Sequence, residues 1–215
     1  MKRILGLLLA AAVCLPAADT LTVFGLKWTV PYSADWQIQN DSGTTVLHMA
    51  QGREPLPGPR RPFQFAIADT PDFSNVTVQL DAKPLKRSLM IVYAYRDASH
   101  FDYVHFSTDT ATKQPVHNGV FHVFGGERVR ISSTEGPASF EATDRWYHIE
   151  VRWNGTTGRV EASVDGKPVL TAVDLSLNSG KVGIGSFNET ADFKSVKIDG
   201  TPVRSGTGAP STFHQ

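Results

Sequence analysis

The chain has 215 residues and carries 21 Lys and Arg against 21 Asp and Glu, so its formal net charge is zero. Hydrophobic residues make up 40% of it, which is ordinary for a globular protein and too rich for a disordered one. Its 18 Gly and 13 Pro indicate many turns, and this composition excludes a long coiled coil, a collagen and a polybasic protein that binds nucleic acid.

Residues 1–18 have the pattern of a secretory signal peptide. Two basic residues precede the apolar run of residues 4–15, and Ala18 offers a small residue for cleavage. The run is shorter than the roughly 20 apolar residues that cross a bilayer, so a retained membrane anchor is the weaker alternative. Lipidation at Cys14 is also weaker, because a bulky valine precedes it. We therefore expect export to the periplasm or the extracellular space, without membrane insertion after cleavage.

The rest of the chain has the pattern of short strands. Runs of β-branched and aromatic residues are bounded by Gly, Asp, Asn or Pro, and no convincing amphipathic helix is found. This pattern predicts an all-β antiparallel sandwich, with one domain over residues 19–200 and a flexible tail over residues 201–215. The proline-rich stretch 51–62 is expected to be a loop, because proline cannot donate to a sheet. The expected strands cover residues 21–24, 27–30, 35–39, 44–49, 63–67, 75–82, 88–96, 101–107, 116–124, 127–132, 146–153, 158–165, 168–172, 181–187 and 193–199.

The hairpin expected over residues 88–107 is apolar on both faces. Such a strand is covered on both sides, or it offers one face to a ligand. One register places Tyr95 beside Asp102, and a slip of one residue places it beside Tyr103 and His105. In either register the second face is a mixed aromatic and polar platform, of the kind on which sugars lie. The alternative is that these tyrosines pack beneath a loop.

A second hairpin is expected where Gly125 and Gly126 separate two strands. Pairing Phe124 with Glu127 places Arg128 and Arg130 together on one face, where they could hold a carboxylate or vicinal hydroxyls. A solvated edge is an equal alternative for the two arginines. His122 falls on the apolar face, which favours a buried histidine with a satisfied hydrogen bond.

No motif in the chain identifies an enzyme. There is no Gly-x-Ser-x-Gly elbow, no phosphate-binding Gly-Lys-Ser/Thr loop and no His-Glu-x-x-His zinc helix. No expected strand carries the close carboxylate pair that a retaining glycosidase needs. If the protein is an enzyme, Asp97, Asp102 or a histidine is the candidate acid or base. No cofactor or metal site is predicted, because the only cysteine leaves with the signal peptide and Asp192 has no acidic cluster beside it for calcium.

Residues 146–200 carry a series of turn and core motifs. In order they read W-Y-H-I-E-V-R-W, V-E-A-S-V-D-G-K-P-V-L, G-K-V-G-I-G-S-F and A-D-F-K-S-V-K-I-D-G. With the earlier runs F-S-N-V-T-V-Q-L-D-A and I-V-Y-A-Y-R-D-A-S-H-F-D-Y-V, they resemble the concanavalin-A-like, laminin-G-like jelly-roll superfamily, and most of all its bacterial 3-keto-disaccharide hydrolase domain family. The resemblance covers residues 20–200 and implies a two-sheet jelly roll with a concave groove and a carbohydrate ligand. It carries over no catalytic residue, and the laminarinase-type Glu-x-Asp-x-x-Glu strand is missing.

These features together predict an exported jelly roll that binds saccharides in a groove, and that hydrolyses them if it is an enzyme. The residues expected to line the groove are Tyr95, Asp102, Tyr103, His105, Arg128 and Arg130. The alternative is a non-catalytic module of the cell envelope that recognises protein, which a flat apolar patch at a sheet edge would favour over a deep groove. A third interpretation is a structural sandwich whose two-sided strands underlie long loops. The sequence predicts no particular oligomeric state.

Overall fold

The computed structural model describes residues 19–203. The expected signal peptide, residues 1–18, and residues 204–215 of the expected tail lie outside the described part. Residues 201 and 202 belong to the last strand, so the folded domain continues past the expected boundary at residue 200. Within residues 19–203, no helix is long and apolar enough to cross a membrane.

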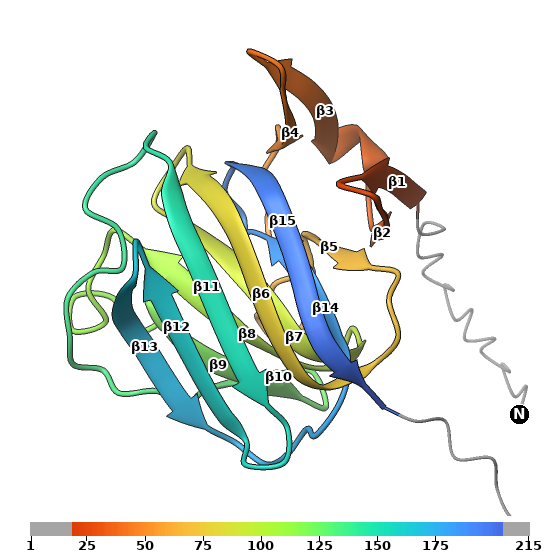
Figure 1. Cartoon of the computed structure of the whole chain (residues 1–215). Coiled ribbons are helices and arrows are strands. Elements are labelled where there is room, and N and C mark those ends of the chain that lie inside the picture. The colour runs from red at the N-terminus through yellow and green to blue at the C-terminus, as the bar shows by residue number, and fades with distance from the viewer. Residues whose placement is uncertain (1–18, 204–215) are drawn as a thin grey trace, which may run out of the picture.

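Fifteen strands and one short 3-10 helix make up the described chain (Figure 1). Each strand expected from the sequence overlaps one of them, and the stretch 51–62 is a loop as predicted. The elements are β1 (Asp19–Val23), β2 (Leu26–Val30), η1 (Ser33–Asp35), β3 (Trp36–Asp41), β4 (Thr44–Met49), β5 (Phe65–Ala68), β6 (Phe73–Pro84), β7 (Ser88–Asp97), β8 (His100–Ser107), β9 (Gly119–Phe124), β10 (Glu127–Arg130), β11 (Tyr147–Asn154), β12 (Arg159–Val164), β13 (Lys167–Val173), β14 (Lys181–Gly185) and β15 (Ala191–Pro202).

The strands form two antiparallel sheets that lie one behind the other (Figure 1). The eight-stranded sheet has the order β1-β2-β5-β14-β7-β8-β9-β10, and the seven-stranded sheet has the order β13-β12-β11-β6-β15-β4-β3. Several neighbours, such as β14 beside β5 and β7, are far apart in sequence, so the chain crosses between the sheets. This architecture is the predicted two-sheet jelly-roll sandwich.

The main core lies between the sheets, and strand β11 shows how the sequence builds it. Side chains of a strand alternate between its two faces. Ile149, Val151 and Trp153 are at most 2% exposed, whereas His148 and Arg152 on the other face meet solvent. Burying each such apolar side chain contributes about 1.5–3 kcal/mol, so the predicted alternation also fixes which face of the sheet is inside.

Two tight hairpins follow from residues that tolerate a positive φ. Gly125 and Gly126 have φ of 60° and 86°, and Phe124 pairs with Glu127 as predicted. Asp165 and Gly166 have φ of 50° and 77° and join β12 to β13 in the same way. A two-residue turn of this hand matches the twist of the strands that it joins.

The eight-stranded sheet is apolar on both faces. Its inner face points to the seven-stranded sheet, and its outer face points away from it. A second cluster of buried side chains occupies the outer face, and we call it the outer cluster. Its members are Phe65, Ile67, Met90, Val92, Phe101, Tyr103, Phe121 and Val123. All eight are at most 7% exposed, so something other than the second sheet must cover them.

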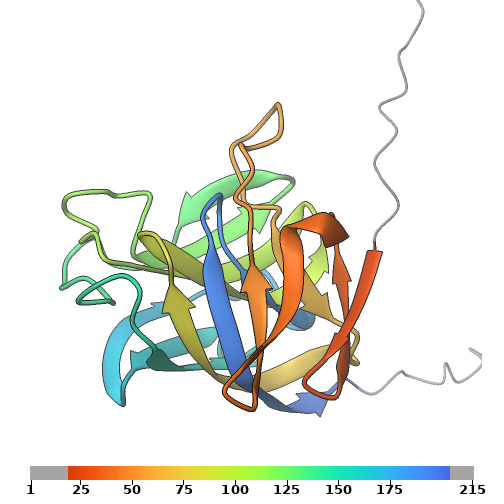
Figure 2. The same cartoon turned by 90° about the horizontal axis from the view of Figure 1, so that it is seen from above.

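The proline-rich loop, residues 51–64 between β4 and β5, reaches over this outer face (Figure 2 shows it in orange). At its base the buried carboxylate of Asp35 accepts hydrogen bonds from Arg53 Nε at 2.6 Å and Gln64 Nε2 at 2.8 Å. Farther along, Arg61 Nε donates to the carbonyl of Ala98 at 2.9 Å. The guanidinium of Arg60 lies 5.3 Å from the ring of Phe187. The loop is therefore held at its base and also where it meets the turn between β7 and β8.

Candidate functional site

Strand β7 places Tyr93 and Tyr95 on opposite faces, although simple alternation would put them together. The reason is a bulge at Ala94, whose φ is 50° and where the pairing with β8 shifts register. Tyr93 is buried in the main core, whereas Tyr95 packs on the outer cluster against Phe65 and Phe101. A bulge re-aims a side chain in this way because one extra residue breaks the period of two.

Strand β8 separates Asp102 from the other predicted site residues. Tyr103 pairs with Val92 and His105 pairs with Met90, so both lie on the outer face. Asp102 pairs with Tyr93 and points to the inner face. The prediction that Asp102 lines the same groove as the tyrosines is therefore wrong. The turn pairs Asp97 with His100, as the first of the two predicted registers requires, but the bulge at Ala94 then shifts the pairing by two residues. Asp102 therefore lies opposite Tyr93, and neither predicted register holds along the strand.

A cavity of about 510 Å³ opens on the outer face, between the proline-rich loop and strands β2, β5, β14 and β7. Four aromatic rings line it, from Tyr32, Phe63, Phe65 and Tyr95. Three basic side chains also line it, from Arg61, Arg96 and Lys181. Tyr32 and Phe63 meet edge to face, as do Phe65 and Tyr95. Burial, followed by the nearby Asp97 carboxylate, raises the pKa of Tyr95, so its phenol stays a neutral hydrogen-bonding group.

A second and much smaller cavity, of about 60 Å³, lies against His105 on the same face. His105 is 1% exposed, and neither ring nitrogen has a hydrogen-bond partner within residues 19–203. Burial, with smaller electrostatic contributions from His117 and Arg128, lowers the pKa of His105 to about 3. The imidazole is therefore neutral at physiological pH, with one donor and one acceptor unused.

Arg128 and Arg130 share a face as predicted, but their guanidinium groups differ in what they contact. Arg128 stacks 5.1 Å from the Phe187 ring and makes one long bond, 3.4 Å, to the hydroxyl of Tyr103. Burial raises the pKa of Tyr103 to about 12. The guanidinium of Arg130 instead donates to five backbone carbonyls, those of Pro115, His117, Asn118, Ser132 and Ser133. Arg130 thus ties two loops together, whereas Arg128 keeps donors for a ligand.

The remaining carboxylate candidates are accounted for by local contacts. Asp97 accepts a hydrogen bond from the backbone N–H of Ser99 at 2.7 Å, which lowers its pKa and holds the β7–β8 turn. It does not converge with Asp102, which faces the other way. Asp192 lies 2.6 Å from His48 Nδ1 and 2.9 Å from Lys83 Nζ, in an ion-paired group on the seven-stranded sheet.

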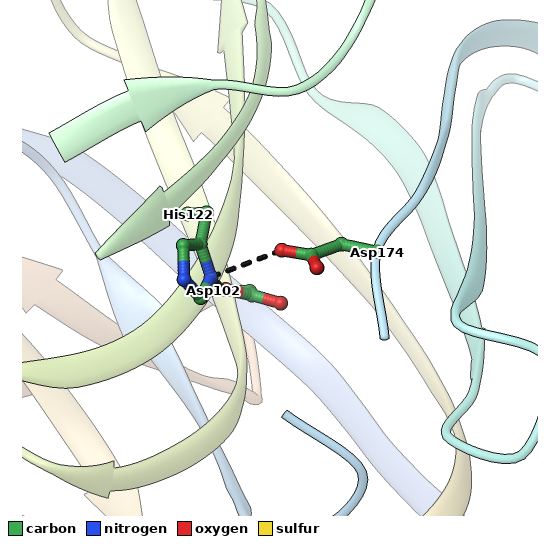
Figure 3. A group of neighbouring side chains, drawn as sticks. All are labelled: Asp102, His122 and Asp174. Atoms are coloured by element: carbon green, nitrogen blue, oxygen red, sulfur yellow. Dashed lines mark hydrogen bonds and ion pairs between the residues drawn. The ribbon is translucent and has the colours of Figure 1, made fainter. Parts of the chain in front are cut away.

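On the inner face, Asp102 meets two residues that its own strand does not supply. His122 of β9 lies with Nδ1 2.6 Å from Asp102 Oδ1 and 3.1 Å from Asp174 Oδ2. Figure 3 shows the Asp174 carboxylate directed at the His122 ring, with Asp102 partly hidden behind that ring. The prediction that His122 is a buried histidine with a satisfied hydrogen bond is confirmed. Asp174, which follows β13, carried no sequence signal, because nothing near it repeats the spacing of a known site.

Comparison with known proteins rests on the fold. A carbohydrate-binding module, CBM66 of Bacillus subtilis, superposes with a TM-score of 0.58 and 15% identity, over 80% of this chain and 94% of that one. A GH43 protein of Bacillus licheniformis superposes with a TM-score of 0.56 and 13% identity, over 85% of this chain and 38% of that one. The chain is a jelly-roll β-sandwich. No family model and no curated protein matches the sequence of this jelly roll. A Bacillus subtilis protein of unknown function with a galectin-like fold superposes with a TM-score of 0.51 and 16% identity, over 79% of this chain and 88% of that one.

Proposed function

We propose that the protein binds saccharides in the larger cavity of the outer face. The observation that carries this proposal is that four aromatic rings and three basic side chains line one cavity of about 510 Å³. The C–H faces of a sugar pack on aromatic rings, and its hydroxyls accept hydrogen bonds from guanidinium and ammonium groups. The fold likeness to a carbohydrate-binding module and to a GH43 protein supports the same proposal.

Binding is the role that these residues support better than hydrolysis. Among the described residues that line the larger cavity, none carries a carboxylate, and glycoside hydrolysis commonly uses two. Glu189 beside the smaller cavity is already engaged, because it accepts hydrogen bonds from Ser88 and Arg87. The sequence resemblance to 3-keto-disaccharide hydrolases makes keto-sugars a saccharide class to include in any test. Export to the periplasm or beyond, proposed from residues 1–18, would bring the protein to such ligands.

The predicted site residues take different parts in this proposal. Tyr95 supplies a ring of the larger cavity, and Arg128 supplies free donors beside the smaller one. Tyr103 is fully buried in the outer cluster, so it supports the arginine from below and does not touch a ligand. His105 meets only the smaller cavity, where a hydroxyl could use its unpaired nitrogens.

A glycan array probed with the full chain tests the proposal, followed by calorimetric titration of the best ligand. Tyr95→Ala is expected to weaken that ligand by roughly tenfold, because it removes one stacking ring. Phe124→Ala is the matched control, since Phe124 is an aromatic residue that is 53% exposed and lies outside the cavity. An array without hits, or equal affinity in Tyr95→Ala and the native protein, would contradict saccharide binding here and favour the protein-recognition alternative.

A further inference from the structure

Figure 3 shows the group formed by Asp102, His122 and Asp174. The group lies on the inner face of the eight-stranded sheet, opposite to the cavity proposed for saccharides. Each residue offers one ligand atom, and these three atoms lie within 4.8 Å of one another. The side chain of Asp102 is 1% exposed, while those of His122 and Asp174 are 11% and 13% exposed. Asp102 is therefore buried in the core, whereas His122 and Asp174 make the group accessible from the surface on one side.

The charges of this group do not balance. The carboxylates of Asp102 and Asp174 both lie within hydrogen-bond distance of His122 Nδ1. A single N–H on this nitrogen cannot make a full hydrogen bond to both of them. Asp102 Oδ2 is buried and has no hydrogen-bond partner among the described residues. Within residues 19–203, no lysine or arginine forms an ion pair with Asp102 or Asp174. Burying a charged oxygen without a partner is costly. Even a protonated His122 supplies one positive charge against two carboxylates, so one negative charge of the group stays unbalanced by the described residues.

We propose that Asp102, His122 and Asp174 bind a divalent zinc ion. One imidazole nitrogen and two carboxylate oxygens are ligands that zinc accepts, and three protein ligands leave a fourth position for water. Calcium prefers six to eight oxygen ligands and is a poorer match for a site with a nitrogen. Tetrahedral zinc needs neighbouring ligand atoms about 3.4 Å apart, so the present separations of 2.6 and 3.1 Å would widen by about 0.8 and 0.3 Å when zinc binds.

One ligand is already oriented by a neighbour outside the group. Ser176 donates to Asp174 Oδ1 from its backbone N–H at 2.8 Å and from its hydroxyl at 2.6 Å. These bonds leave Asp174 Oδ2, the oxygen that faces His122, as the one directed into the group. Residues around a metal site commonly hold its carboxylates in this way. They strengthen metal binding, because a carboxylate that is already oriented loses less conformational entropy when it binds the ion.

Calorimetric titration of the full chain with zinc chloride, after treatment with a chelator, tests the site. We expect one zinc ion per chain, a higher melting temperature with zinc, and no comparable effect of calcium or magnesium. His122→Gln and Asp174→Asn should each weaken zinc binding by roughly tenfold or more. Asparagine has the same size and shape as aspartate, and residue 174 lies in a loop, so Asp174→Asn is expected to fold. This variant therefore still tests the site if His122→Gln folds poorly.

His48→Gln is the matched control, because His48 Nδ1 also lies 2.6 Å from an aspartate but has no second carboxylate on that nitrogen. Zinc binding to this variant should equal that of the native protein. The proposal is overturned if the native chain does not take up one zinc ion, or if Asp174→Asn retains native affinity. It is also overturned if His48→Gln loses binding as strongly as the site variants. None of these results depends on whether the outer face binds saccharides.

Discussion

Truncation of Phe101 tests whether the outer face is a second core that the proline-rich loop covers. Phe101 is fully buried, and its ring centroid lies 5.2 Å from that of Phe65 and 6.0 Å from that of Tyr95. Replacing a core phenylalanine by alanine costs about 3–5 kcal/mol, and the loss of an aromatic pair is worth up to about 1 kcal/mol of this. We therefore expect Phe101→Ala to lower the free energy of unfolding by about 4 kcal/mol.

Urea denaturation followed by tryptophan fluorescence measures this loss as a lower midpoint with an unchanged slope. In a domain of this size it corresponds to a melting temperature about 8–16 °C lower. Phe124→Ala makes the same substitution at a ring that is 53% exposed and is expected to cost less than about 1 kcal/mol. If the two variants lose equal stability, the outer face is open to water and the description of a second core is wrong.

Two further predictions concern polar residues of the same face. Arg130→Lys should lower the free energy of unfolding by about 2 kcal/mol, because one ammonium group cannot reach the carbonyls on both sides of the β9–β10 hairpin. Arg128→Lys is the control, and it should cost less than about 1 kcal/mol in the same urea titration. The pKa of His105 is about 3 in the folded protein and 6.5 ordinarily, so the unfolded state binds more protons between these values and stability falls as the pH drops below about 6.5. His105→Leu should therefore reduce the stability lost between pH 7 and pH 5 by about 2 kcal/mol, and an unchanged loss would contradict the burial of a neutral His105.

The strands and their hairpins were predictable because their signals are local. Alternation in β11 follows from residues two apart, and the pairing of Phe124 with Glu127 follows from the two glycines between them. The order of the strands in each sheet is different in kind. The placement of β14 between β5 and β7 depends on packing between segments about 90 residues or more apart, for which the sequence alone offers only a family resemblance.

The bulge at Ala94 explains why the candidate site was only partly predicted. Strict alternation along the strand places Tyr93 and Tyr95 on the same face. The positive φ of Ala94 interrupts this alternation, so the two side chains point to opposite faces. Alanine does not favour a positive φ, as glycine or asparagine would, so the sequence contains no residue that indicates the bulge. The predicted aromatic face therefore exists and includes Tyr95, but its neighbours are Phe65 and Phe101 and not Asp102.

The alternation of side chains along β8 also explains why Asp102 lies in the proposed zinc site. A carboxylate between two residues of the outer cluster must point inward, where Phe101 and Tyr103 cannot accompany it. A buried charge there is tolerable only with partners, and β9 brings His122 opposite to it while the chain after β13 brings Asp174. These residues are 20 and 72 positions away from Asp102 in the sequence, and no helix or strand period links them. If the group served only to balance the charge of Asp102, His122 would suffice, and a second carboxylate would make the balance worse. The presence of Asp174 on the same nitrogen is therefore the feature that favours a bound cation over a simple buried ion pair.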